Sequence, residues 1–374
     1  MKNFFLALLF LTILQISFKP LTAQDNDRQI QFPDVPGYQT LVCDLHMHTV
    51  FSDGSVWPDI RVGEADKDGL DAISLTEHLE YQPRMEDIPH PDRNRVYELA
   101  RHYASGKDLI VINGSEITRR MPPGHANAIF LKDANELLGT DSLEVFQKAG
   151  QQGAFVFWNH PHWTAQKPDG IASLTEFHKE LIKNNLIHGI EVVNEKTYSD
   201  EALQIALDHN LCILGNSDIH GLTDWHFGVP EGGHRPVTLV FAEENTAESL
   251  KSALFDGRTV VWFNNLLIGK EANLKSLLNA SVKTGKAFYK NGKTLAQLEI
   301  ENLSDAEFIL QNKTTFAFHG NADVIVLPPH SVMQLQVKTK ERLEEIPLTF
   351  DVLNAIKAPG KHQRLDLNFT VQVH

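Results

Sequence analysis

Histidine and carboxylate side chains recur along the first two thirds of the chain, each time at the end of a short apolar run. In chain order they are His46, His48 and Asp53, Glu77 and His78, Glu116 and His125, His160 and His162, Glu191, and Asp218 and His220. Imidazole and carboxylate groups are ligands for manganese, zinc and iron, whereas iron–sulfur and structural cysteine sites need clustered thiols. The chain has only two cysteines. These residues therefore predict a site for divalent metal ions built from distant segments.

The spacing within two of these groups fits strand geometry. Side chains two positions apart in a strand point the same way, so His46 and His48 can face one ion together. Asp218 and His220 repeat the same spacing in another segment. Each pair is expected at the end of its own strand.

The elements that must position these groups follow from the apolar runs between residues 38 and 263. Seven runs rich in Val, Ile, Leu and Phe predict buried strands: TLVCDLH, DAISLTEH, DLIVINGSE, HANAIFLK, GAFVFWNHP, HGIEVVN and LCILGNSDIH. Helices are predicted between them, as in YSDEALQIALDHN with Ser199 as N-cap and in DSLEVFQKAGQQG, which stops at Gly153. The alternation indicates a parallel α/β barrel or wound sheet, whose active site lies at the carboxyl ends of the strands.

The pattern changes after residue 271. In RLDLNFTVQV the apolar Leu365, Leu367 and Phe369 alternate with polar residues, and SVMQLQVKT repeats this design. Strict alternation is typical of a half-buried antiparallel sheet. Residues 272–374 are therefore expected to form a small β-sandwich after an α/β domain at 39–271.

The N-terminus reads as a secretory signal peptide at 1–23, followed by a linker at 24–38. Lys2 precedes the apolar run FFLALLFLTILQISF, and LTA offers small residues for cleavage before Gln24. An uncleaved membrane anchor is the alternative, because a span needs roughly 18 apolar residues. We expect an exported, periplasmic protein without stable membrane association after cleavage.

The charge of the chain limits the kinds of partner it can bind, and its cysteine content limits the possible disulfides. The formal net charge is −14, from 48 acidic and 34 basic side chains, which argues against binding long nucleic acid. Small anionic substrates remain compatible where metal ions offset the charge. Cys43 and Cys212 lie in apolar runs and are expected to be buried free thiols, with a disulfide as the alternative. Nothing in the sequence indicates an oligomeric state.

Four motifs in order resemble the polymerase and histidinol phosphatase (PHP) family: DLHMHTVFSDG, LTEH, GSE followed by GHANAIF, and NHPHW followed by GNSDIHG. The resemblance implies a distorted seven-stranded α/β barrel with three metal ions at the carboxyl ends of its strands. It implies three ligand sets: His46, His48, Glu116 and Asp218; Glu116, His125 and His160; and Asp53, His78 and His220. Ligand type leaves manganese, zinc and iron open.

The resemblance also implies hydrolysis of phosphate esters by a hydroxide bridging two metal ions, with Glu116 and Asp218 at the centre of the chemistry. Around this centre, His162 is a candidate for protonating the leaving group or contacting phosphate, and Arg119, Arg120 and Arg258 are candidates for binding phosphate oxygens. The overall plan, with a signal peptide and a C-terminal β-domain, is similar to that of exported PHP phosphodiesterases.

Three functions stay open on the sequence alone. The first is an exported phosphoesterase acting on small phosphate esters, with diesters favoured. The second is a nucleotide phosphatase or nuclease of the same family. The third is a non-catalytic, metal-stabilised binding module, against which the retention of every ligand type counts.

Overall fold

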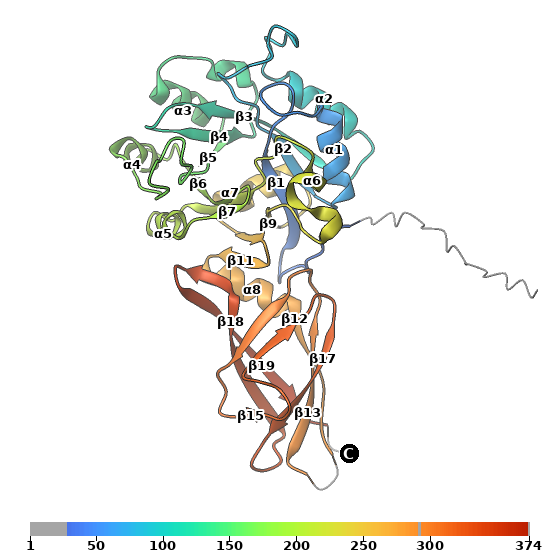
Figure 1. Ribbon diagram of the computed structural model, residues 1–374. Helices are drawn as coiled ribbons and strands as arrows, with labels where there is room; N and C mark the ends of the chain where they lie inside the picture. Colours follow the sequence, from blue (N-terminus) through green and yellow to red (C-terminus); the bar gives the residue numbers. More distant parts are fainter. Residues whose placement is uncertain (1–27, 291–292, 373–374) are drawn as a thin grey trace, which may run out of the picture.

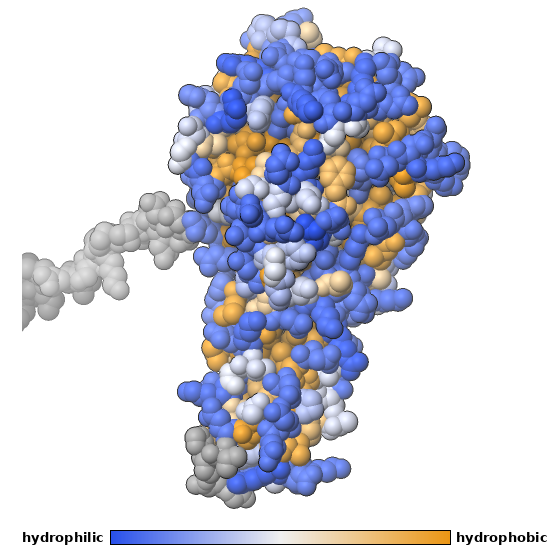
Figure 2. Space-filling view, turned by 180° about the vertical axis from the view of Figure 1, so that it is seen from behind, coloured by the Kyte–Doolittle hydropathy of each residue, from blue (hydrophilic) through white to orange (hydrophobic). Residues whose placement is uncertain are grey.

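The computed structural model describes residues 28–290 and 293–372, so the expected signal peptide lies outside the described residues. The chain forms a broad α/β domain and a narrower β-domain placed end to end (Figure 1). The space-filling view shows the same outline, with apolar and polar side chains interspersed on the visible face of both domains (Figure 2). No helix among the described residues is long and apolar enough to cross a membrane.

Each of the seven predicted runs forms a strand of the α/β domain. These strands are β1 (Gln39–Met47), β2 (Ala72–Leu75), β3 (Ile110–Thr118), β4 (His125–Ile129), β5 (Phe155–Trp158), β6 (Gly189–Asn194) and β8 (Cys212–Asn216). The sheet curls back on itself after β8, because the Asp218 N–H donates to the His46 carbonyl over 2.9 Å and the His48 N–H to that of Ile219 over 3.1 Å. The sheet therefore closes as a distorted barrel, with the end of β1 held against the segment after β8.

Not all barrel strands are parallel, which differs from the simplest expectation. β4 runs antiparallel to both β3 and β5. Only residues 119–124 separate β3 from β4, too few for the helical crossover that a parallel neighbour requires. The sheet continues on the other side of β1 with three antiparallel strands, β9 (Val237–Ala242), β10 (Thr259–Phe263) and β11 (Leu266–Gly269), and β6 also carries the short β7 (Thr197–Tyr198).

Helices surround this sheet (Figure 1). They are α1 (Pro58–Lys67), α2 (Arg95–Tyr103), α3 (Ser142–Gln151), α4 (Glu176–Lys183), α5 (Asp200–Asp208), α6 (Thr223–Phe227), α7 (Ala247–Phe255) and α8 (Glu271–Ser281), with short 3-10 turns at Ala134–Leu137 and Val229–Glu231. The predicted cap of α5 is confirmed, because the Ser199 hydroxyl accepts from the Ala202 N–H over 3.1 Å. α3 likewise ends just before Gly153, which adopts a positive φ of 73°.

The C-terminal region is a β-sandwich, as predicted. One sheet holds β12 (Val282–Tyr289), β13 (Leu295–Asn302), β17 (Val332–Lys338) and β15 (Ala317–Phe318), and the other holds β16 (Val324–Leu327), β14 (Phe308–Asn312), β18 (Glu345–Ala358) and β19 (Lys361–Thr370). Leu365, Leu367 and Phe369 of β19 are buried while their neighbours are exposed, so the predicted alternation is confirmed. The first strand starts at Val282, and residues 272–281 belong to α8 instead.

The two domains share one sheet. β11 of the barrel pairs in parallel with β18 of the sandwich, through Leu267 with Ala355 and Ile268 with Ile356. The described residues 28–38, which the sequence assigns to a linker, also pack against both domains. The Gln31 N–H donates to the Asp305 carboxylate over 2.7 Å, and the Phe32 ring meets Trp262 edge-on at 5.2 Å.

The two cysteines are buried and free. The Cys43 side chain lies in the barrel core on β1, and Cys212 begins β8. The expectation of free thiols is confirmed.

Candidate metal centre

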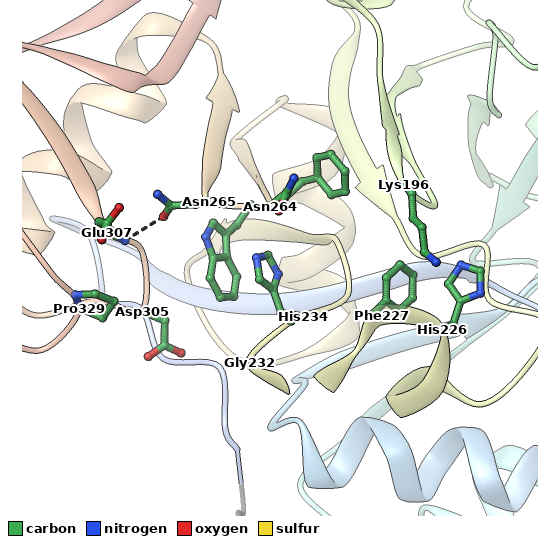
Figure 3. Close-up of a pocket in the computed structure, with 13 residues that line it drawn as sticks. Lys196, His226, Phe227, Gly232, His234, Asn264, Asn265, Asp305, Glu307 and Pro329 are labelled. Atoms are coloured by element: carbon green, nitrogen blue, oxygen red, sulfur yellow. Dashed lines mark hydrogen bonds between the residues drawn. The ribbon is translucent and has the colours of Figure 1, made fainter. Parts of the chain in front are cut away.

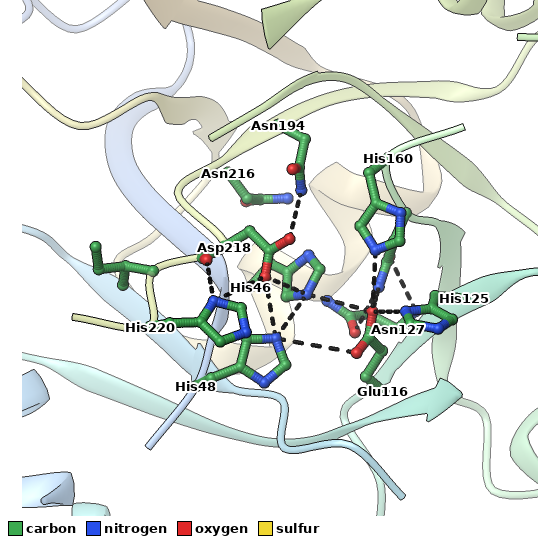
Figure 4. A network of polar contacts seen from close by, with 12 residues as sticks. His46, His48, Glu116, His125, Asn127, His160, Asn194, Asn216, Asp218 and His220 are labelled. Atoms are coloured by element: carbon green, nitrogen blue, oxygen red, sulfur yellow. Dashed lines mark hydrogen bonds and ion pairs between the residues drawn. The ribbon is translucent and has the colours of Figure 1, made fainter. Parts of the chain in front are cut away.

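One end of the barrel gathers the predicted ligands from six segments of the chain, and Figure 4 shows seven of these side chains. Most of them lie at or just after the carboxyl end of a strand, as in a parallel barrel. His125 is the exception, since it is the first residue of β4. Because β4 runs antiparallel to its neighbours, its start meets the ends of the other strands.

The first predicted ligand set converges closely. His46 and His48 are fully buried, and their Nε2 atoms lie 3.1 Å apart. Asp218 Oδ1 lies 3.2 Å from His46 Nε2 and 3.0 Å from His48 Nε2. Glu116 Oε1 lies 3.5 Å from His46 Nε2. These four side chains can therefore face one ion.

Glu116 is the hub between this set and the second. Its Oε1 lies 3.1 Å from His125 Nδ1 and 3.4 Å from His160 Nε2. Its Oε2 contacts His78 Nδ1. A carboxylate with imidazoles on both sides has the position required to bridge two ions.

The third set surrounds Asp53. His220 Nε2 lies 3.1 Å from Asp53 Oδ1, and His78 Nε2 lies 3.3 Å from Asp53 Oδ2. The potential ligand atoms of His48 also lie within 4.8 Å of this set, and those of His78 lie within 4.8 Å of Glu116 and His125. The sets thus overlap more than the sequence predicted, because His48 and His78 each lie between two of them.

Neighbouring acceptors fix the imidazoles in the form that binds metal. The Nδ1–H of His46 donates to Glu191 over 2.9 Å, that of His78 to the Thr118 hydroxyl over 2.8 Å, and that of His220 to the Asp218 carbonyl over 2.7 Å. In each ring the opposite nitrogen, Nε2, faces a carboxylate of the pocket and can bind a cation once it carries no proton. Such outer partners orient metal-binding histidines and set their tautomer.

Three carboxylate oxygens in the cage are buried and accept no hydrogen bond from the described residues: Asp53 Oδ1, Glu116 Oε2 and Asp218 Oδ1. Burial opposes their charge, but the surrounding histidines outweigh it and hold the pKa of Glu116 and of Asp218 well below the usual range. Buried anionic oxygens without donors fit cation ligands. The residues present therefore fit divalent metal ions.

His48 and His78 differ in the direction in which their surroundings shift the pKa. Burial, with the nearby His220, lowers the pKa of His48 to about 3, so this ring is neutral and ready to bind a cation. Burial also opposes protonation of His78, but Glu116 and Asp53 outweigh it and raise the pKa of His78 to about 10. Without a cation, a proton offsets the carboxylates there.

Two candidate ligands sit on left-handed backbone. His160 has a φ of 28° and Asp218 a φ of 48°, a region that costs residues other than glycine roughly 1–3 kcal/mol. Both are held by backbone hydrogen bonds, from the His160 N–H to Glu191 Oε2 and from the Asp218 N–H to the His46 carbonyl, each 2.9 Å long. On this backbone the His160 side chain reaches Glu116, and that of Asp218 reaches His46 and His48.

Two arginines hold the loops that carry the ligands. Arg61 is fully buried and donates to the carbonyls of His48 over 2.9 Å and Ile219 over 3.1 Å. Arg84 donates to the carbonyls of Ser52 over 2.9 Å, Gly54 over 2.6 Å and Asp53 over 3.3 Å. Sequence reasoning missed both, because nothing in their local sequence marks them.

The residues predicted to contact the substrate do not line the metal pocket. The position of Arg258 corrects the prediction that it binds phosphate. Its guanidinium lies over the Tyr38 ring and donates to the Phe241 carbonyl, at the start of β1 and thus at the opposite end of the barrel from the metal pocket. Arg119 pairs with Glu80 at 2.8 Å and is not among the residues that line the metal pocket. His162 bonds Thr197 at 2.8 Å and also lies off that lining. Arg120 is exposed in the loop after β3.

The metal pocket has a volume of about 430 Å³. Besides the candidate ligands it is lined by Tyr81, Thr118, Trp163, Asn194 and Glu195. Of these, only Trp163 carried a sequence signal, since it follows the NHPH motif. Glu191 lies behind the cage and accepts four hydrogen bonds, from His46, Asn216, Asn194 and the His160 N–H.

A larger cavity of about 620 Å³ lies between the domains (Figure 3). Lys196 and His226 line one end, His234 lies in the middle, and Asp305 lines the β-domain end. The His234 ring stacks on that of Trp262, which also lines the cavity. No group of metal-ligating side chains occurs in this cavity within the described ranges. The smaller metal pocket is the one that contains the groups of potential metal ligands.

Comparisons with known proteins agree with this geometry. A family model for an Ig-like domain (DUF5001) matches residues 282–368, within the β-sandwich. The structure of a two-domain protein from Bacteroides vulgatus, containing a predicted PHP-like metal-dependent phosphoesterase, is 41% identical, with a TM-score of 0.85, and the match covers 91% of this chain and 98% of that chain. No curated protein matches the chain.

Two more distant structures also match. PsfC from Pseudomonas syringae is 16% identical, with a TM-score of 0.43 and coverage of 60% of this chain and 92% of its own. The lesion-specific endonuclease PfuEndoQ from Pyrococcus furiosus is 16% identical, with a TM-score of 0.41 and coverage of 78% and 70%. Family membership rests on the Bacteroides relative, which matches across both domains and nearly end to end. The chain belongs to the PHP-like metal-dependent phosphoesterases.

Proposed function

We propose that this phosphoesterase hydrolyses small phosphate diesters at the cage around Glu116 and Asp218. The observation that carries the proposal is a set of buried carboxylate oxygens, one each from Asp53, Glu116 and Asp218, that accept no hydrogen bond from the described residues and are surrounded by imidazole nitrogens. Such a cage suits divalent cations and, through them, a phosphate group. Divalent metal ions bound there supply a water nucleophile at neutral pH and offset the charge of the transferring phosphoryl group.

The role of the chain is to bind and orient. His46, His48, Glu116 and Asp218 would hold the first ion, Glu116, His125 and His160 the second, and Asp53, His78 and His220 the third. Three ions are proposed because three overlapping groups of side chains present ligand atoms within 4.8 Å of one another. Manganese, zinc and iron all suit this donor set.

A diester is favoured over a highly charged substrate by the lining of the pocket. No lysine or arginine occurs among its lining residues in the described ranges, whereas Glu195 adds a further carboxylate at the rim. With charge supplied only by the ions, a substrate with one negative charge per phosphate is easier to accommodate than a monoester dianion or a polyphosphate.

The test compares bis(p-nitrophenyl) phosphate with p-nitrophenyl phosphate on protein loaded with manganese, zinc or iron and on protein stripped with EDTA. We expect faster turnover of the diester and none after stripping. Glu116→Gln should lose metal and activity together, by more than the roughly 10–100-fold that an outer partner contributes. The control is Glu180→Gln, on the exposed face of α4. Metal binding without turnover of either ester would refute the proposal and leave a binding module.

We also propose export to the periplasm. Its support is the N-terminal sequence, with Lys2 before an apolar run and small residues before Gln24. Expression of the full chain in a bacterium, followed by N-terminal sequencing of the periplasmic fraction, should find mature protein beginning near Gln24. Full-length protein retained in the membrane fraction would contradict it.

A further inference from the structure

Two aromatic side chains stand at the ends of a row of rings that crosses the metal pocket. The Tyr81 ring lies 5.7 Å from that of His78, His78 lies 5.4 Å from His125, and His125 lies 5.6 Å from Trp163. Trp163 also meets His160 edge-on at 5.1 Å. Both aromatic residues line the same pocket as the metal-binding side chains. The place where a phosphate would sit is thus bounded by two aromatic rings.

Both rings remain open to solvent. Tyr81 is 52% exposed and Trp163 is 45% exposed. Within the described residues, neither the Tyr81 hydroxyl nor the Trp163 indole N–H makes a hydrogen bond, so the two rings keep both a free face and a free polar edge. Core packing does not account for side chains exposed to this degree.

The backbone of Trp163 is held in place before any ligand binds. Its N–H donates to the His160 carbonyl over 2.9 Å, and its carbonyl accepts from the Lys167 N–H over 2.8 Å. The turn from His160 to Lys167 therefore ties the indole to a candidate metal ligand. An aromatic residue positioned this way loses little conformational entropy when a planar group stacks on it.

The chemistry of the pocket wall restricts what the rings can meet. Because the lining has no lysine or arginine in the described ranges, a second phosphate or a carboxylate on the substrate would find no counter-ion beyond the metals. An uncharged planar group has no such cost and can bury its face against tyrosine or tryptophan.

We propose that Tyr81 and Trp163 form a stacking subsite for a planar, uncharged substituent esterified to the phosphate, either an aryl ring or a nucleobase-bearing group. The inference rests on the proposed phosphoesterase function and specifies its substrate class as single-phosphate esters with an aromatic arm.

Binding of phosphonates, which are not hydrolysed, tests the subsite apart from turnover. Isothermal titration of manganese-loaded protein, at a pH where both phosphonates are monoanions like a diester, should give a Kd for phenylphosphonate about tenfold or more below that of methylphosphonate, as expected for stacking worth one or more aromatic contacts. Tyr81→Ala and Trp163→Ala should each reduce this preference about threefold or more, and the double variant should abolish it. Tyr81→Phe should retain it.

The matched control is Trp225→Ala. Trp225 is 83% exposed in α6 and does not line the metal pocket, so its loss should leave the preference unchanged. Equal affinity of wild-type protein for the two phosphonates, or a preference that survives in the double variant, would overturn the proposal. A titration with a phosphonate of adenosine separates the two sources of planar group, because tighter binding than phenylphosphonate identifies a nucleobase arm and weaker binding an aryl arm.

Failure of the hydrolytic function gives a different result. If the protein binds methylphosphonate but turns over no ester, the phosphoesterase proposal fails, and the two phosphonate affinities still show whether the stacking subsite exists. If it hydrolyses diesters but shows no phenyl preference, only the stacking subsite fails.

Discussion

Glu191→Gln replaces a buried carboxylate by an amide of nearly the same shape behind the metal cage. Oε1 of Glu191 accepts from His46 Nδ1 and from the Asn216 amide, each over 2.9 Å, and Oε2 accepts from the His160 N–H over 2.9 Å and the Asn194 amide over 2.8 Å. All four partners are donors. A glutamine can accept with only one of its two terminal atoms.

The loss of stability depends on whether each donor can be replaced by an acceptor when the glutamate becomes an amide. The His160 N–H is backbone, and the Asn216 amide is fixed because its oxygen accepts from the Leu45 N–H over 2.9 Å. Whichever way the new amide turns, its NH₂ meets one of these donors. Losing one hydrogen bond to a charged acceptor and burying an unpaired donor costs about 2–5 kcal/mol of unfolding free energy. Metal affinity should fall about 10–100-fold, because in one orientation of the amide His46 loses the acceptor of its Nδ1–H or clashes through Asn216, and in the other the backbone of His160 loses its acceptor, and both histidines are candidate ligands.

Urea unfolding followed by intrinsic fluorescence, in EDTA so that bound metal adds nothing, measures the first quantity. Manganese titration by calorimetry measures the second. Glu180→Gln, at an exposed position of α4, should change stability by no more than about 0.5 kcal/mol. If Glu191→Gln matched this control in stability and bound manganese as tightly as wild type, the four-donor geometry would be refuted.

Three further predictions concern other parts of the chain. Arg84→Ala should remove the hold on the Asp53 loop, so calorimetry should show one manganese site weakened and the others retained, with Arg84→Lys restoring part of it; unchanged titrations would contradict this. Burial lowers the pKa of His178 from 6.5 to about 4, so the unfolded chain takes up the proton first. Stability should therefore fall by up to about 3 kcal/mol between pH 6.5 and pH 4, and His178→Gln should flatten this decline in urea titrations at each pH, whereas parallel curves would count against it. Arg235→Met should cost about 3–5 kcal/mol in the same urea assay, because it leaves the buried carboxylate of Asp44 without a cation and that of Asp68 with Arg28 alone, and a loss below about 1 kcal/mol would exclude the pairing.

The strands and the cage residues were predictable because their signals are local. Most ligand groups lie at the end of an apolar run, and strands buried on both faces in a barrel carry such runs. For the pairs His46 with His48 and Asp218 with His220, the sequence therefore indicated both the type of ligand and that the two side chains point the same way. Ser199 as a helix cap and the alternation of Leu365, Leu367 and Phe369 were readable for the same reason.

The features that could not be predicted depend on contacts between distant segments. The antiparallel direction of β4 follows from a short connection, and Arg258 was misplaced because its strand enters the barrel from the other end. Long side chains such as Arg61 and Arg84 reach carbonyls far along the chain, which no local pattern reveals. Glu191 is visible in sequence as a polar residue within a predicted strand, but three of its four partners come from three other segments and only Asn194 lies on its own strand.

The ladder between β11 and β18 has a consequence for any attempt to divide the protein. A fragment ending near residue 271 would leave Leu267 and Ile268, both fully buried, on an open sheet edge without a partner. Unpaired apolar edges recruit other chains, so such a fragment would self-associate and not yield an independent enzyme. The same ladder also opposes hinge bending between the two domains, because bending would break its main-chain hydrogen bonds.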